Sequence, residues 1–340
     1  SATASRRPEA AGRAGGRGAG RPVRAAACGL ALALAGCASR GPVLPQLTAA
    51  QFPARVELAQ TPYFPQRDYQ CGPAALATVL GASGAPADPD SLVAEVYLPG
   101  RQGSLQPELI AATRSRGRLP YVLPPRVDAL LAQLAAGTPV LVMQKLGAGP
   151  WPGWHYAVLV GYDATSDEFI LRSGTDERLE LSSRRFLMTW DRAERWAMVA
   201  LPPDRMPAAP ELARYMEAAA GLEAVGKADV AAQAYESATR QWAAEALPRL
   251  GLANLAYARG DLRAAGRGFR AALELAPGNI AARNNRAAVL LGLGCPAAAR
   301  REIAIAQTQA GAGPLAAAVA ATVQEIEAAH GPDAPGCPPD

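Results

Sequence analysis

The C-terminal third of this sequence repeats with a period of 34 residues, and no other feature restricts the fold as strongly. Gly226, Gly260 and Gly294 mark this period. Glycine lets a chain reverse tightly between two helices, and alanine lets neighbouring helices pack closely. The period therefore predicts stacked helical pairs that share one continuous core. Three further sets keep the same spacing: Tyr235, Phe269 and Ile303; Ala238, Ala272 and Ala306; and Ala219, Ala253 and Ala287.

This pattern resembles the tetratricopeptide repeat (TPR), in which a glycine between two helices is followed by a large side chain and then by an alanine. The resemblance implies an all-α TPR solenoid of about three repeats with a capping helix over residues 211–329. Residues 330–340 would form a tail. The resemblance also implies a concave groove that binds an extended peptide or a protein partner.

The segment before the repeats has helical patterns first and strand patterns afterwards. Residues 71–81 are apolar throughout and predict a buried helix, whereas short β-rich runs separated by turns begin at residue 139. This order predicts an α+β domain over residues 55–202, with a helical lobe packed on an antiparallel sheet. Further helices are expected at 90–97, 106–116 and 126–136, and strands at 55–60, 139–143, 155–162, 168–172, 179–181 and 196–201.

The N-terminus has the pattern of a targeting segment. Residues 25–36 form an uncharged apolar run that is too short to cross a hydrocarbon core of about 30 Å, but it fits a secretory signal. The run ends in Leu34-Ala35-Gly36-Cys37, which resembles a lipobox. The resemblance implies a lipoprotein signal peptide at 1–36, lipidation of Cys37 and a tether at 37–54. Because Ala38-Ser39 brings no Asp after Cys37, it also implies a lipid anchor in the outer membrane of a bacterial cell envelope, facing the periplasm.

The charge of the chain is concentrated in this leader. The whole sequence carries a formal charge of +4, but residues 1–36 hold six arginines and a single acid, Glu9. The rest of the chain therefore has no positive excess that would favour nucleic acid as a partner. The membrane, reached through the lipid anchor, is the expected partner instead.

The cysteines beyond the predicted cleavage point divide into three roles. Cys37 would carry the lipid, and an oxidising compartment makes Cys295 and Cys337 candidates for a disulfide. Cys71 is then left over, and an odd thiol in an exported protein suggests reactivity. The spacing of Cys and His predicts no metal site, and we expect no cofactor.

Cys71 is the candidate nucleophile because it begins an apolar helix, where backbone N–H groups should stabilise the thiolate and lower its pKa. Gly72 should leave space beside the sulfur for a substrate carbonyl. His155, at the start of a strand, is the plausible base, since the other histidine, His330, lies in the tail. A Gln shortly before the cysteine can donate its side-chain N–H to an oxyanion.

The motif Gln66-x4-CGPAAL, followed 84 residues after Cys71 by HYAVLVGYD, resembles the papain-like bacteriocin-processing (double-glycine) cysteine peptidases and their stand-alone relatives. The resemblance implies Cys71 as nucleophile, His155 as general base and acid, and Gln66 as oxyanion donor, with Gln70 as the weaker choice. The family places an orienting Asp about 18 residues after the His. Ser173 stands there instead, and Asp176 is the candidate replacement; Ser173, a water or a backbone carbonyl are the alternatives.

We therefore expect a membrane-anchored hydrolase of peptide bonds, whose repeats recruit a substrate or a protein partner. The departure at Ser173 keeps a second interpretation open, in which a weak or inactive peptidase fold serves as a TPR scaffold. A third is an amidase or acyltransferase with the same Cys-His pair, since papain-like sites are not restricted to peptides.

Overall fold

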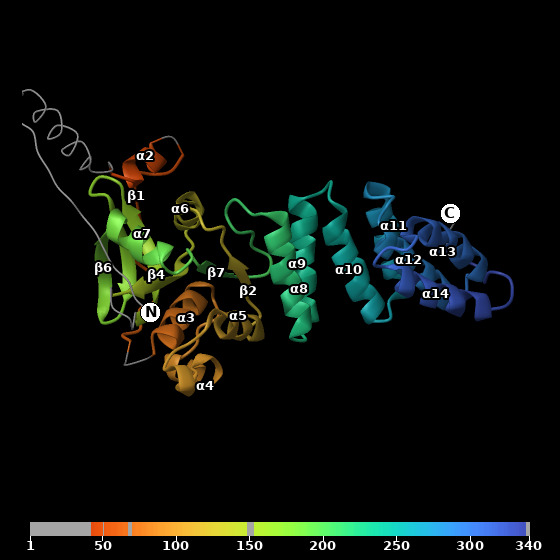
Figure 1. Cartoon of the computed structure of the whole chain (residues 1–340), viewed down its shortest axis with the longest axis horizontal. Coiled ribbons are helices and arrows are strands. Elements are labelled where there is room, and N and C mark those ends of the chain that lie inside the picture. The colour runs from red at the N-terminus through yellow and green to blue at the C-terminus, as the bar shows by residue number, and fades with distance from the viewer. Residues whose placement is uncertain (1–41, 50, 67–69, 148–152, 338–340) are drawn as a thin grey trace, which may run out of the picture. The chain divides into compact units, whose positions relative to one another are not determined.

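The computed structural model describes residues 42–49, 51–66, 70–147 and 153–337 (Figure 1). The predicted signal peptide and Cys37 lie outside these residues. No helix of the described part is both long enough and apolar enough to cross a membrane.

Seven strands in the described residues form one antiparallel sheet in the order β2-β7-β3-β4-β5-β6, and β1 pairs with the remaining length of β4. The α+β prediction is confirmed. Each expected strand is present with somewhat different bounds, and β2 is an addition, because a proline within a four-residue run gave no clear strand pattern. The strands are β1 (Arg55–Glu57), β2 (Leu119–Val122), β3 (Val140–Leu146), β4 (Gly153–Asp163), β5 (Glu168–Ser173), β6 (Asp176–Ser182) and β7 (Ala197–Leu201).

Helices cover both faces of this sheet (Figure 1). Side chains of a strand alternate between faces, so in β4 Val158 and Val160 pack with α3, whereas Ala157 and Leu159 pack with the core that includes α6 and α7. This double burial explains why β4 is apolar almost throughout its length. The helices are α3 (Cys71–Ala82), α4 (Pro89–Val96), α5 (Gln106–Ser115), α6 (Val127–Ala135) and α7 (Ser183–Asp191), with a 3-10 turn at Pro99–Arg101.

The predicted tether at 37–54 is wrong in its second half. A short helix, α2 (Leu44–Thr48), lies there, and Leu44 is fully buried in the main core. The backbone N–H groups of Val43 and Leu44 donate to Oδ1 of Asp167 at 3.1 and 2.9 Å. This segment is therefore docked on the α+β domain.

The predicted helical pairs follow in sequence. Gly226, Gly260 and Gly294 each join the two helices of a pair, with φ angles of +73°, +78° and +76°, which glycine adopts without strain. Tyr235 and Phe269, which share a repeat position, are both buried. The helices are α8 (Leu212–Ala224), α9 (Ala228–Gln241), α10 (Ala246–Ala258), α11 (Leu262–Leu275), α12 (Ile280–Gly292), α13 (Pro296–Ala310) and α14 (Ala316–Ala328).

The first repeat shares its core with the sheet. Tyr121 of β2 and Tyr215 of α8 belong to one buried cluster, and the Tyr121 hydroxyl accepts a hydrogen bond from the backbone N–H of Glu211 at 3.0 Å. The boundary predicted between residues 202 and 211 is thus a continuous packed junction.

Candidate active site

Cys71 is the first residue of α3, and Gln70 precedes the helix in a non-helical conformation. The helix is buried along nine of its twelve residues, so Cys71 lies at its accessible end, half-buried. Backbone N–H groups of Tyr156, Gly72 and Cys71 itself favour the thiolate, as a helix N-terminus should. Burial outweighs them, however, and raises the pKa of the Cys71 thiol. The expectation of a lowered pKa is therefore wrong in this structure.

His155 lies on β4, directly before the residue whose backbone N–H faces Cys71. It pairs with Gln144 of β3, and its Nε2 is hydrogen-bonded to Oγ of Ser173 at 2.8 Å. Burial lowers the pKa of His155, which favours the neutral imidazole. The two directions imply a resting state in which the Cys71 thiol is protonated and the His155 imidazole is neutral.

Gln66 lies where β4 and β5 stop pairing. Pairing between these strands ends with Val158 and Arg172. The Gln66 segment is hydrogen-bonded just past this pair, to residues near the start of β4 and after the end of β5. The backbone N–H of Gln66 donates to the carbonyl of Gly174 at 3.0 Å, and Nε2 donates to the carbonyl of Tyr156 at 3.2 Å. The side-chain amide is therefore fixed beside the strand that carries His155.

The third position of the site is occupied by Ser173. Asp176 faces Ser173 across the tight turn that joins β5 and β6, and it is exposed. Gly174 in this turn has φ +61°. Of the alternatives that the sequence left open, the structure puts Ser173 against the imidazole, so an uncharged hydroxyl stands where the related peptidases are expected to carry an acid.

Gly72 has a different role from the one expected. A Cβ at this position would lie 2.2 Å from Oγ of Ser104, so the space beside the glycine is filled by another side chain. Gly72 therefore permits the close packing of Ser104 against the start of α3, and it opens no room there for a substrate.

Sequence reasoning missed three buried polar atoms in this region. Oγ of Ser104, Oε2 of Glu108 and the hydroxyl of Tyr156 have no hydrogen-bond partner among the described residues. Burial and then the nearby negative charges of Cys71 and Glu108 raise the pKa of Tyr156. Tyr156 follows His155 directly in the HYAVLVGYD motif, which is the one signal that could have drawn attention to it.

The remaining predicted site residues lie elsewhere. Cys295 and Cys337 are joined by a disulfide in the repeat region, whereas Cys37 is outside the described residues. The described residues contain no cluster of three or more His, Cys, Asp or Glu placed to hold a metal ion.

Residues 58–197 match the Peptidase_C39 like family. This part of the chain is therefore a C39-like α+β domain, and the match includes Gln66, Cys71, His155 and Ser173. A comparison with curated proteins returned no match.

Three solved structures are similar to parts of the chain. The Yersinia enterocolitica type III secretion translocator chaperone SycD is 19% identical, covers 34% of this chain and 83% of its own, and has a TM-score of 0.32. A C39-like peptidase from Bacillus anthracis is 16% identical over 43% of this chain and 97% of its own, with a TM-score of 0.36. A double glycine motif protease from an AMS/PCAT transporter, in complex with the leader peptide, is 16% identical; the match covers 42% of this chain and 91% of that protease, with a TM-score of 0.34. The family match carries the assignment of the domain.

Proposed function

We propose that this protein is a cysteine peptidase in which Cys71 is the nucleophile and His155 is the general base and acid. The observation that carries the proposal is the convergence at β4: the Cys71 sulfur meets the backbone N–H of Tyr156, next to a histidine whose Nε2 is held by Ser173. With Nε2 engaged, Nδ1 is the ring nitrogen left to accept the thiol proton.

The reaction would proceed by acyl transfer to sulfur. His155 takes the proton from Cys71 as the sulfur attacks the substrate carbonyl, because the resting pair is neutral. The tetrahedral oxyanion would be stabilised by the Cys71 backbone N–H and by the second N–H of the Gln66 amide. His155 then protonates the leaving amine, and water hydrolyses the thioester to release the acid and restore the thiol.

We also propose that Cys37 is lipidated and holds the enzyme at a membrane of the cell envelope, most plainly the outer membrane. Since docking begins at Val43, only five residues lie between it and Cys37. An extended chain of that length reaches about 20 Å at most. The α+β domain would then be kept close to the membrane surface, with the repeats available to recruit substrate or partner.

A second candidate function is a binding scaffold without turnover. Two observations favour it: Ser173 brings no negative charge to His155, and burial alone works against the thiolate–imidazolium pair. On this account the C39-like domain would only bind, and the helical repeats would assemble partners.

Substrate profiling separates these functions. Purified full chain is incubated with a peptide library and, in parallel, with small amides, and products are identified by mass spectrometry. A peptidase cleaves peptides, and cleavage disappears in Cys71→Ala and His155→Ala but persists in His330→Ala, the matched control on the other histidine. Turnover of small amides alone would indicate an amidase. No product from either library, with the protein folded, would contradict hydrolysis and favour the scaffold.

A further inference from the structure

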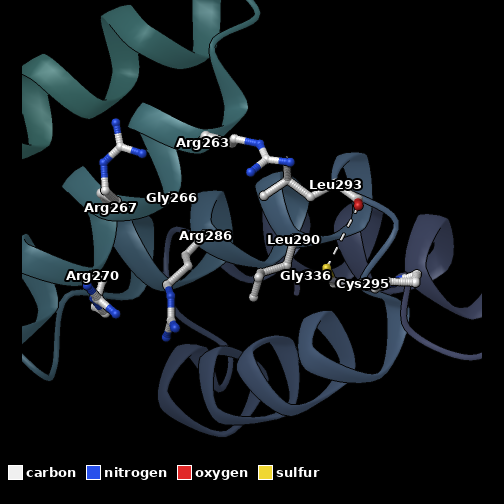
Figure 2. Close-up of a pocket in the computed structure, with 10 residues that line it drawn as sticks. Arg263, Gly266, Arg267, Arg270, Arg286, Leu290, Leu293, Cys295 and Gly336 are labelled. Atoms are coloured by element: carbon white, nitrogen blue, oxygen red, sulfur yellow. Dashed lines mark hydrogen bonds between the residues drawn. The ribbon is translucent and has the colours of Figure 1, made fainter. Parts of the chain in front are cut away.

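A cavity of about 190 Å³ lies between helices of the second and third repeats. Figure 2 shows Arg263, Arg267 and Arg270 on α11, and Arg286 and Leu290 on α12. The cavity thus combines four arginines with the apolar side chain of Leu293, and it involves none of the residues of the candidate active site.

The positive charges of this cavity are only partly neutralised. Arg286 is paired with Glu302, which also pairs with Arg283 at 2.8 Å, so one acid serves two guanidinium groups. Arg270 approaches Glu274 at 3.8 Å. No ion pair or hydrogen bond links the side chains of Arg263 and Arg267 to the described residues.

The placement of Arg263 and Arg267 is unfavourable for the isolated helix. They are four residues apart on α11, where like charges face each other and repel. Only 8% of Arg286 is exposed, and it lies one turn before the buried Leu290 on α12. A cluster that concentrates repelling guanidinium groups in one cavity is suited to a ligand that brings negative charge.

The far wall of the cavity is the C-terminal tail, where Pro335 and Gly336 line it. This wall is fixed at both ends. Ahead of it, the Ala297 backbone N–H donates to Oδ1 of Asp333 at 2.7 Å, and after it, Cys337 is bonded to Cys295. The disulfide therefore holds the tail against the arginine cluster.

We propose that this cavity binds acidic segments of polypeptide, in which a carboxylate side chain adjoins an apolar one. Guanidinium groups bind carboxylates through paired hydrogen bonds, and the partly exposed Leu293 offers apolar contact to the neighbouring residue. The inference deepens the proposed recruiting role of the repeats, because it names the chemistry of the recruited segment and puts its site between α11 and α12. Peptide binding at this cavity does not require Cys71 to react.

Binding is measured by fluorescence anisotropy on the full chain carrying Cys71→Ala, so that the probe is not cleaved. The probe is a labelled peptide of alternating Glu and Leu, and the matched peptide replaces each Glu with Gln. The Glu peptide should bind at least about tenfold more tightly, and the double variant Arg263→Ala, Arg267→Ala should lose about tenfold in affinity. The control pair Arg185→Ala, Arg240→Ala removes the same charge elsewhere and should leave affinity unchanged. Cys295→Ser with Cys337→Ser should weaken binding because the tail wall is released.

Several results would overturn the inference. One is equal affinity for the Glu and Gln peptides, and another is an equal loss of affinity in the Arg263/Arg267 and the Arg185/Arg240 double variants. Displacement of the peptide by equimolar inorganic phosphate, or binding only to vesicles of anionic lipid, would also contradict it. Circular dichroism checks that each variant is folded. Peptide cleavage by the chain with Cys71 intact is scored separately, so a failure here and a failure of the peptidase proposal are distinguishable.

Discussion

The hydrogen bond between His155 and Ser173 gives a direct way to alter the proposed chemistry. In Ser173→Asp, a carboxylate replaces the hydroxyl that now meets Nε2 at 2.8 Å. Two unit charges about 4 Å apart interact by about 4 kcal/mol at an effective dielectric constant near 20. Desolvation of the carboxylate removes part of this gain, so we expect the pKa of His155 to rise by about 1–3 units.

The expected change in Cys71 reactivity follows from the pKa shifts of His155 and Cys71 in the unmodified chain. Burial now lowers the pKa of His155 and raises that of Cys71, so the thiol of the unmodified chain stays protonated at neutral pH. Its alkylation by iodoacetamide should therefore keep rising beyond the ordinary thiol pKa of about 8.5. An imidazolium that persists to higher pH stabilises the thiolate, so Ser173→Asp should react faster at pH 6–7, by about tenfold or more.

Alkylation rates between about pH 5 and 10 are followed by peptide mapping of Cys71. Ser173→Asn is the matched control, because an amide can keep a hydrogen bond to the ring without adding charge, and it should leave the pH profile near that of the unmodified chain. A folded Ser173→Asp variant whose profile stays where it was, or moves to higher pH, would refute the reasoning.

Three further variants test contacts that hold the fold together. Gly161→Ala places a Cβ 2.4 Å from the carbonyl oxygen of Val56, so the β1–β4 contact must shift; we expect a loss of about 1–3 kcal/mol, and an unchanged melting temperature would contradict this. Asp167→Ala removes the acceptor of the Val43 and Leu44 N–H groups and of the Ser183 hydroxyl, so limited proteolysis should cut faster between residues 43 and 55 while the sheet stays intact; an unaltered cleavage rate would argue against docking of α2. Replacing Cys295 and Cys337 with Ser opens a link over 42 residues, and urea unfolding should show a loss of up to about 4 kcal/mol; equal midpoints with and without the disulfide would contradict this.

Much of the architecture could be predicted because its signals are local. The repeat glycines adopt positive φ angles, which glycine takes without strain, so their identity alone marks the turns between helices. Similarly, α3 is apolar along its whole length because it is buried on nearly all sides. By contrast, α7 has only nine residues, and its buried Phe186 and Trp190 stand among arginines, which made its pattern too short to distinguish from a loop.

The parts that could not be predicted depend on tertiary contacts. Leu44 is buried in the main core, and its segment is hydrogen-bonded to Asp167, more than 120 residues away; no local pattern reveals such a partner. The helix position of Cys71 was evident from the sequence, but its burial was not, and burial decides the direction of its pKa. The choice between Ser173 and Asp176 likewise depends on where the turn at Gly174 falls.

The central claim is that His155 serves Cys71 during acyl transfer. The most direct test is to mix the full chain with an activated peptide ester, quench in acid and weigh the intact protein. We predict one acyl group on Cys71, absent in Cys71→Ala, formed at least about 100-fold more slowly in His155→Ala and at the original rate in His330→Ala. Acylation of Cys71 at the same rate in His155→Ala as in the unmodified chain would contradict the account.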